Sequence, residues 1–190
     1  MKILVISISP ERRKFLNYDY ELIEGEDNID EVLPKMKVRY NTKKETTERI
    51  ARCFASKLKA LEYIINNKID EVILCEDDSI KTKEIPTAWS KDKEFKKGEN
   101  LEIINNFKVG VNEIDYTKFR WTQINALWIP TWEQAKELLE KIRDIKDYIH
   151  FDILLSKKRL VKKLYYPAIF KHHDHLNKSQ VATNPGIIID

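Results

Sequence analysis

The chain has 190 residues, of which 42% are hydrophobic, so it is long and apolar enough to bury the core of one domain. We therefore expect a single domain over residues 1–190 and not a disordered chain. The 34 basic and 31 acidic residues leave a formal net charge of +3. A nucleic-acid-binding protein of this size would more often carry a large surplus of one sign, so the balance argues against a nucleic-acid partner.

The sequence contains no obvious targeting or membrane signal. Its first apolar run, Ile3–Ile8, is too short for the hydrophobic region of a signal peptide. No stretch approaches the roughly 20 apolar residues that span a bilayer. The two cysteines, Cys53 and Cys75, fall within an expected helix and an expected strand, so we interpret them as small buried hydrophobic residues. These features lead us to expect a cytoplasmic protein without a transmembrane segment.

Short apolar runs alternate with amphipathic stretches in the first half of the chain, which predicts an α/β fold. The longest amphipathic stretch is expected to be capped by Thr46 or Thr47 and to end at Asn66–Asn67. The expected elements are a strand at Ile3–Ile8, a short helix from Pro10, a strand at Tyr20–Ile23, a loop over 25–44, a helix at Thr46–Asn67 and a strand at Val72–Cys75.

The regular pattern dissolves between Lys81 and Lys118, where lysines alternate with acids around one moderately apolar piece, Leu101–Phe107. This region is either a solvated loop or a flexible loop that faces an acceptor. Regular structure is expected to return with a strand at Trp121–Ile129, a helix at Trp132–Arg143 that begins with a Thr131–Gln134 capping box, a short helix at Ile149–Ser156 and a strand at Leu160–Tyr166.

The most informative segment is the end of the strand Val72–Cys75, where the apolar run stops on Glu76, Asp77 and Asp78. Because side chains alternate along a strand, we expect Glu76 and Asp78 to point the same way. Three like charges at the edge of an apolar sheet need neutralisation, and Mn²⁺ or Mg²⁺ would provide it through oxygen ligands. Ligands also bind at the carboxyl ends of strands in open α/β sheets. The alternative is a solvated acidic turn.

The C-terminal part of the chain holds three of its four histidines, His172, His173 and His175. A neutral imidazole suits Mn²⁺, so one of them, His173 in our assignment, is expected to complete the coordination that Glu76 and Asp78 begin. Lys178 is expected to neutralise phosphate. The alternative is a chance surface cluster. The spacing of cysteines and histidines matches no structural zinc motif.

Glycine-rich phosphate-binding motifs are missing from the sequence, which has only four glycines, and no nucleophile elbow is present. A phosphate-bearing ligand would therefore be held by a metal ion and by cationic side chains. Asp152 is an acid within the apolar segment Ile149–Leu155. Burial would raise its pKa and make it a competent general base. It is equally placed to cap the short helix.

The order and spacing of these segments resemble glycosyltransferase family 25, which includes lipooligosaccharide galactosyltransferases and their viral and collagen-modifying relatives. The most specific match is Val72–Asp78, which is similar to the Glu-Asp-Asp form of that family's metal motif. Lys57 stands where the family usually has a histidine. The other similar segments are Ser9–Arg13, Cys53–Leu61, Thr122–Leu139, Phe151–Asp152 and Pro167–Ser179.

This resemblance implies a GT-A fold, a twisted and mostly parallel mixed sheet flanked by helices, with a nucleotide-sugar donor and usually Mn²⁺. The metal would bridge the two phosphates of the donor, for which a UDP-sugar is our first choice, and would stabilise the departing nucleoside diphosphate. By resemblance, Glu76 and Asp78 contact the metal and the ribose, and Asp77 lies beside them. The family is mostly inverting, and the base that this requires is assigned to Asp152.

We therefore expect a glycosyltransferase that moves a hexose-type sugar to a hydroxyl group of a glycan or glycoprotein. Ser7, Ser9 and Arg12 are expected near the nucleotide, by analogy of fold. One alternative is a metal-dependent nucleotidyltransferase or nuclease, because acids at a strand end also serve phosphoryl transfer. The other is a catalytically degenerate transferase-like domain that binds a partner or glycan without turnover, an alternative that the substitution at Lys57 leaves open.

Overall fold

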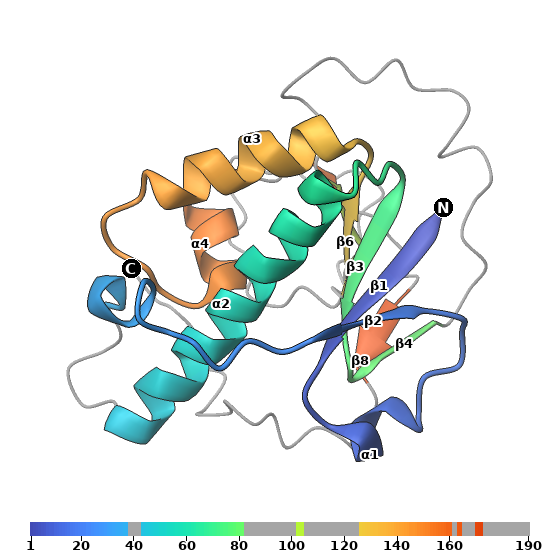
Figure 1. The fold of residues 1–190 in the computed structure, drawn as a ribbon, viewed down its shortest axis with the longest axis horizontal. Coiled ribbons are helices and arrows are strands. Elements are labelled where there is room, and N and C mark those ends of the chain that lie inside the picture. The colour runs from blue at the N-terminus through green and yellow to red at the C-terminus, as the bar shows by residue number, and fades with distance from the viewer. Residues whose placement is uncertain (38–42, 82–101, 105–125, 161–162, 165–169, 173–190) are drawn as a thin grey trace, which may run out of the picture.

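The structure is a computed structural model in which residues 1–37, 43–81, 102–104, 126–160, 163–164 and 170–172 are described. In this part of the chain a mixed, mostly parallel sheet packs against helices, which confirms the predicted α/β fold (Figure 1). The strand order is β2-β1-β3-β6-β5-β7, and three of the five neighbouring pairs are parallel. The strands are β1 Lys2–Ser7, β2 Glu21–Glu24, β3 Val72–Glu76, β5 Glu102–Ile104, β6 Ala126–Ile129 and β7 Lys163–Leu164.

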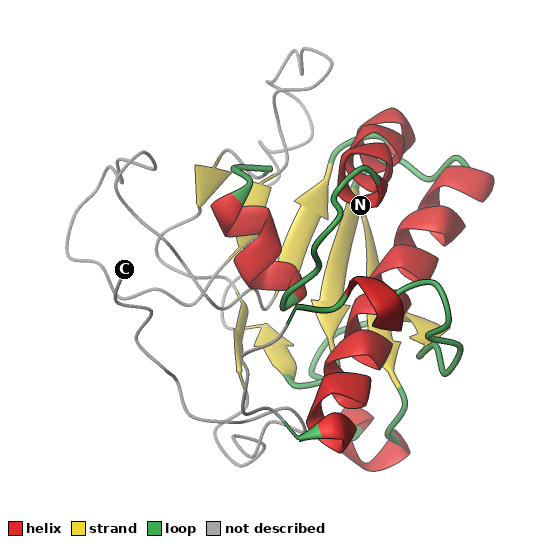
Figure 2. Ribbon diagram, turned by 90° about the vertical axis from the view of Figure 1, so that its left-hand side faces the viewer, coloured by secondary structure: helices red, strands yellow, loops and turns green. Residues whose placement is uncertain are grey.

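The three longest described helices, α2, α3 and α4, gather on one face of the sheet, and Figure 2 looks onto this helical layer with the strands behind it. The short helix α1 follows β1 directly. Among the described residues, no helix has the length and apolar character needed to cross a membrane. The helices are α1 Pro10–Arg13, the 3₁₀ turn η1 Leu33–Lys35, α2 Lys44–Asn66, α3 Trp132–Arg143 and α4 Phe151–Lys157.

Both faces of the central strands are buried, which explains their nearly continuous apolar sequences. Even-numbered residues of β1 and β3, such as Leu4 and Leu74, belong to the core shared with α2, α3 and α4. Odd-numbered residues, such as Val5 and Ile73, belong to a second cluster on the opposite face, together with Phe170. The parity of a residue number in these strands therefore tells which face its side chain occupies.

A small second sheet lies beside the end of β3. Its two antiparallel strands are β4, Ser79–Lys81, and β8, Phe170–His172. The side-chain amide of Asn17 donates to and accepts from the backbone of the last residue of β4, at 2.8 Å in both directions. The hydroxyl of Tyr18 donates to the carbonyl oxygen of Ser79 at 2.9 Å. These contacts attach the chain after α1 to the segment that follows the acidic triplet.

The long helix α2 begins earlier than the sequence pattern predicted. Its first residue is Lys44, and the residue before it, Lys43, makes no capping hydrogen bond with its side chain. The prediction that Thr46 or Thr47 caps the helix is therefore wrong. Both threonines lie within the first turn, and the hydroxyl of Thr47 donates back to the carbonyl oxygen of Lys43 at 3.3 Å. The predicted end at Asn66–Asn67 is confirmed.

The strands β6 and β7 lie within the predicted segments Trp121–Ile129 and Leu160–Tyr166, and α3 has the predicted bounds. The helix α4 begins two residues later and ends one residue later than the predicted Ile149–Ser156. The strand β5 lies within the apolar piece Leu101–Phe107, where we predicted a loop region and no strand. Apart from Lys81 and 102–104, the proposed loop region over 81–118 lies outside the described residues. Cys75 is buried as expected, but Cys53 is exposed, so that expectation is wrong for Cys53.

The predicted capping box at the start of α3 is half formed. The hydroxyl of Thr131 accepts from the backbone N–H of Gln134 at 3.3 Å, but the amide group of Gln134 is buried and makes no hydrogen bond within the described part of the chain. A buried amide without a partner costs about 1–3 kcal/mol. We therefore expect Gln134→Leu to increase the free energy of unfolding by about 1 kcal/mol, and Thr131→Ala to decrease it by about the same amount. Urea denaturation measures both, and a destabilised Gln134→Leu variant would show that the amide has a partner in solution.

Candidate functional site

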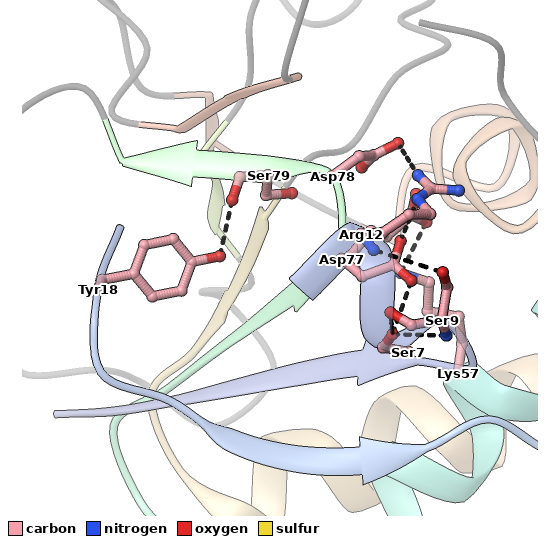
Figure 3. A network of polar contacts seen from close by, with 9 residues as sticks. Ser7, Ser9, Arg12, Tyr18, Lys57, Asp77, Asp78 and Ser79 are labelled. Atoms are coloured by element: carbon pink, nitrogen blue, oxygen red, sulfur yellow. Dashed lines mark hydrogen bonds and ion pairs between the residues drawn. The ribbon is translucent and has the colours of Figure 1, made fainter. Parts of the chain in front are cut away.

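The candidate site is built where the parallel strands β1 and β3 end side by side. Ile6 and Glu76 are paired in the β1–β3 register, so the residues that follow them, Ser7 and Asp77, are neighbours. The Ser7 hydroxyl donates to the Asp77 carboxylate at 2.8 Å, and both residues are buried (Figure 3). Ser7 is an odd-numbered residue of β1, so its side chain lies on the face opposite α2 and α3, and the hydrogen bond places the Asp77 carboxylate next to it. This edge is the carboxyl end of parallel strands, where α/β folds bind ligands.

Arg12 joins two of the three acids of the triplet. Its Nε lies 2.9 Å from Asp77 Oδ1, and its Nη2 lies 2.6 Å from Asp78 Oδ2 (Figure 3). Arg12 is held there by α1, whose N-cap is Ser9: the Ser9 hydroxyl accepts the Arg12 N–H at 3.4 Å. The Ser9 N–H in turn donates to the Ser7 hydroxyl at 3.0 Å. The three residues expected near the nucleotide are thus in one hydrogen-bonded group with Asp77.

Glu76 points to the other face of the sheet, where it meets α2. Its carboxylate lies 2.8 Å from the ammonium of Lys57, a buried residue in the middle of that helix. Burial alone would lower the pKa of Lys57, but the charge of Glu76 and the hydrogen bond to it outweigh burial, so the pKa is raised. The expectation that Glu76 and Asp78 share a side is wrong. β3 ends at Glu76, the chain turns, and Asp78 joins Asp77 on Arg12.

The electrostatic balance at Asp77 follows from its burial. Burial raises the pKa of this carboxyl group above its ordinary value. The Ser7 hydroxyl and the Arg12 guanidinium oppose that change, whereas the neighbouring charges of Asp78 and Glu76 add to it. The pKa of Asp77 is raised overall because the effect of burial, added to that of the neighbouring acids, outweighs the contacts with Ser7 and Arg12. An additional positive charge at this edge of the sheet would stabilise the ionised form.

Asp152 approaches the same site from α4. It lies in the first turn of that helix, whose N-cap is His150, so Asp152 is not the capping residue. Its carboxylate accepts the N–H of Ile153 at 2.8 Å. Its pKa is raised to about 7, mainly by burial and to a smaller extent by the charge of Glu76, while the N–H of Ile153 and the charge of Lys57 oppose the rise. Asp152, Glu76 and Lys57 are therefore close enough to influence one another's charge.

Three residues of the site were not singled out as functional by the sequence pattern. Lys57 carried a usable signal, because it lies three residues after Phe54 and four before Leu61, on the buried face of α2. Asn17 and Tyr18 carried none, since their contacts are with a segment more than sixty residues away.

The predicted contribution of the C-terminal segment is tested only in part. His173 and Lys178 lie outside the described residues. The backbone of His172 is paired with that of Ser79 in the β4–β8 sheet, which brings this segment next to the residue that follows the acidic triplet.

The oxygen-rich donor set of the triplet suits Mg²⁺ or Mn²⁺ chemically. In the described part of the chain, however, no three His, Cys, Asp or Glu side chains are gathered so as to hold a metal ion. The reason is visible in the contacts: Asp77 and Asp78 bind Arg12, and Glu76 binds Lys57. The acids are present at the expected edge, and side-chain cations neutralise them.

Comparison with known proteins adds no family assignment. No family model matches this chain, and no curated protein sequence matches it significantly.

Proposed function

We propose that this protein is a metal-dependent glycosyltransferase with a GT-A-like fold, which transfers a sugar from a nucleotide diphosphate to a hydroxyl of a glycan or glycoprotein. The donor nucleotide binds at the carboxyl ends of β1 and β3, with a UDP-sugar as the first choice. Ser7, Ser9 and Arg12 hold the nucleotide and its phosphates, and Asp152 takes the proton of the attacking hydroxyl.

The observation that carries this proposal is the convergence at one sheet edge of groups that are distant in sequence. The acids come from the end of β3, Ser7 and Arg12 from the β1–α1 connection, and Asp152 from α4. An Mn²⁺ or Mg²⁺ ion would be held by oxygens of Asp77 and Asp78, the two acids that share a side, and would supply charge stabilisation for the departing diphosphate. The raised pKa of Asp152 suits a group that must accept a proton near neutral pH.

The donor site is tested by thermal unfolding with UDP, GDP, CDP or dTDP, each with Mn²⁺, Mg²⁺ or EDTA. One nucleotide with metal, at a hundred times its Kd, is expected to stabilise the protein by about 2.7 kcal/mol, which is a rise in Tm of roughly 5–10 °C. Asp78→Asn should abolish this rise because it removes one of the negative charges that hold the metal. Asp147→Asn, at an exposed aspartate away from the site, should retain it.

If none of the four nucleotides raises the Tm in a metal-dependent way, the proposed donor site is refuted. It would favour a second candidate function, a transferase-like domain that binds a partner or glycan without turnover. The observation behind this alternative is that every acid of the triplet already has a cation from the chain itself, Arg12 or Lys57.

A further inference from the structure

We propose that Arg12 is an exchangeable internal cation: it leaves Asp77 and Asp78 when a divalent metal ion binds, and it then binds the phosphates of the donor. This inference rests on the proposed function of the site. It also adds an order to binding, because the guanidinium becomes available to phosphate only after the metal has taken its place.

Arg12 and a metal ion bound by the acids would need the same carboxylate oxygens. Two nitrogens of one guanidinium lie 2.9 Å and 2.6 Å from an oxygen of Asp77 and an oxygen of Asp78. The three side chains are only 10–15% exposed, so water contributes little to the solvation of these charges. Both carboxylates are therefore stabilised by direct contact with a cation. A metal ion that binds the same oxygens would have to take the place of Arg12.

Arg12 belongs to a short helix outside the core, whereas Lys57 belongs to a long helix that forms part of it. Helix α1 has four residues, none of which is buried. Lys57, in contrast, projects from the middle of the 23-residue helix α2 and is itself buried. The two cations of the site thus have different roles. Lys57 is the fixed partner of Glu76, and Arg12 is the replaceable partner of Asp77 and Asp78.

The group that Arg12 binds after it moves follows from the geometry of its guanidinium. A guanidinium presents paired donors that match phosphate oxygens as well as they match carboxylates. The donor phosphates would lie against the metal-loaded acids, within the reach of a side chain that has just left them. The same residue therefore opposes metal binding in the empty protein and favours phosphate binding in the loaded one.

This double role predicts effects of opposite sign, which separates it from a purely structural role. Arg12→Gln removes the competitor, so Mn²⁺ should bind about tenfold tighter in the absence of nucleotide, while UDP in saturating Mn²⁺ should bind about tenfold weaker. Arg12→Lys keeps the charge but cannot make the bidentate contact, so its affinity for Mn²⁺ should lie between those of the wild type and Arg12→Gln. Arg13→Gln, the matched control on the same helix, should behave as the wild type in both titrations.

The experiment is a titration of Mn²⁺, followed by the electron paramagnetic resonance signal of the free ion, and then a calorimetric titration of UDP. Unfolding in EDTA checks that each variant is folded. If Arg12→Gln binds Mn²⁺ no more tightly than the wild type while the wild type binds both ligands, the exchange is refuted and the proposed function stands. If neither protein binds Mn²⁺, both proposals fail. Tighter Mn²⁺ binding with unchanged UDP affinity would refute the phosphate-binding half.

Discussion

Asp152→Asn is expected to lower the rate of sugar transfer by about 100- to 10,000-fold, the range by which a positioned base accelerates proton transfer. The amide has the shape of the carboxylate and can still accept the N–H of Ile153, but it cannot take a proton from the acceptor. Metal-dependent nucleotide binding should be unchanged, because the carboxylate of Asp152 is not part of the group formed by Ser7, Arg12 and Asp77. Loss of binding as well as transfer would mark Asp152 as a structural residue.

The pH dependence of the wild type and of Asp152→Asn provides the control for this prediction. Burial raises the pKa of Asp152 from 3.8 to about 7, so transfer by the wild type should increase with pH and level off above pH 7. Between about pH 4 and 7 the folded protein holds a proton that the unfolded chain has released, so the free energy of unfolding decreases as the pH rises. Urea denaturation at pH 5 and pH 8 should show this loss in the wild type and a smaller one in Asp152→Asn. A pH-independent transfer rate would contradict the assignment of the base.

The parts of the fold that depend on local pattern could be predicted from the sequence. Apolar runs identified β1 and β3, the helical repeat identified α2, and Thr131 identified the start of α3, because each signal lies within a few residues of the element that it defines. The start of α2 could not be predicted in the same way, since Thr46 and Thr47 satisfy the pattern of a cap although the helix begins at Lys44.

The site was predictable in its location but not in its internal pairing. An apolar strand that ends in acids identifies a polar edge of a sheet, and the structure brings Ser7, Arg12 and the acids together there. Which cation meets which acid depends on strand parity and on the turn after Glu76. Strand parity directs the Glu76 side chain towards α2, and the turn after Glu76 places the Asp78 side chain on the same side as Asp77. The strand alternation that we extrapolated holds only as far as the strand itself.

The ion pair between Lys57 and Glu76 should show a strongly unequal response to the removal of either partner. Glu76→Gln leaves the buried Lys57 ammonium without a carboxylate, and we expect a loss of about 3 kcal/mol in the free energy of unfolding. Lys57→Met retains the apolar stem of the side chain and leaves a carboxylate that is 41% exposed and can be hydrated, so a loss of about 1 kcal/mol is expected. Urea denaturation in EDTA measures these values without a contribution from bound metal.

The double variant distinguishes a real pair from two independent residues. Once Lys57 has become Met, Glu76→Gln no longer isolates a buried cation, so the double variant should be about as stable as Lys57→Met alone, with a coupling energy of about 2–3 kcal/mol. Lys59 and Glu26, a partly exposed pair 3.5 Å apart with Lys59 on the same helix, provide the matched control, and Lys59→Met should change stability by less than about 0.5 kcal/mol. Additive losses at Lys57 and Glu76 would mean that the fixed cation of the site is not bound to its acid in solution. Arg12 would then be the only cation that neutralises the triplet among the contacts described at this edge of the sheet, and it would be more difficult for a metal ion to displace.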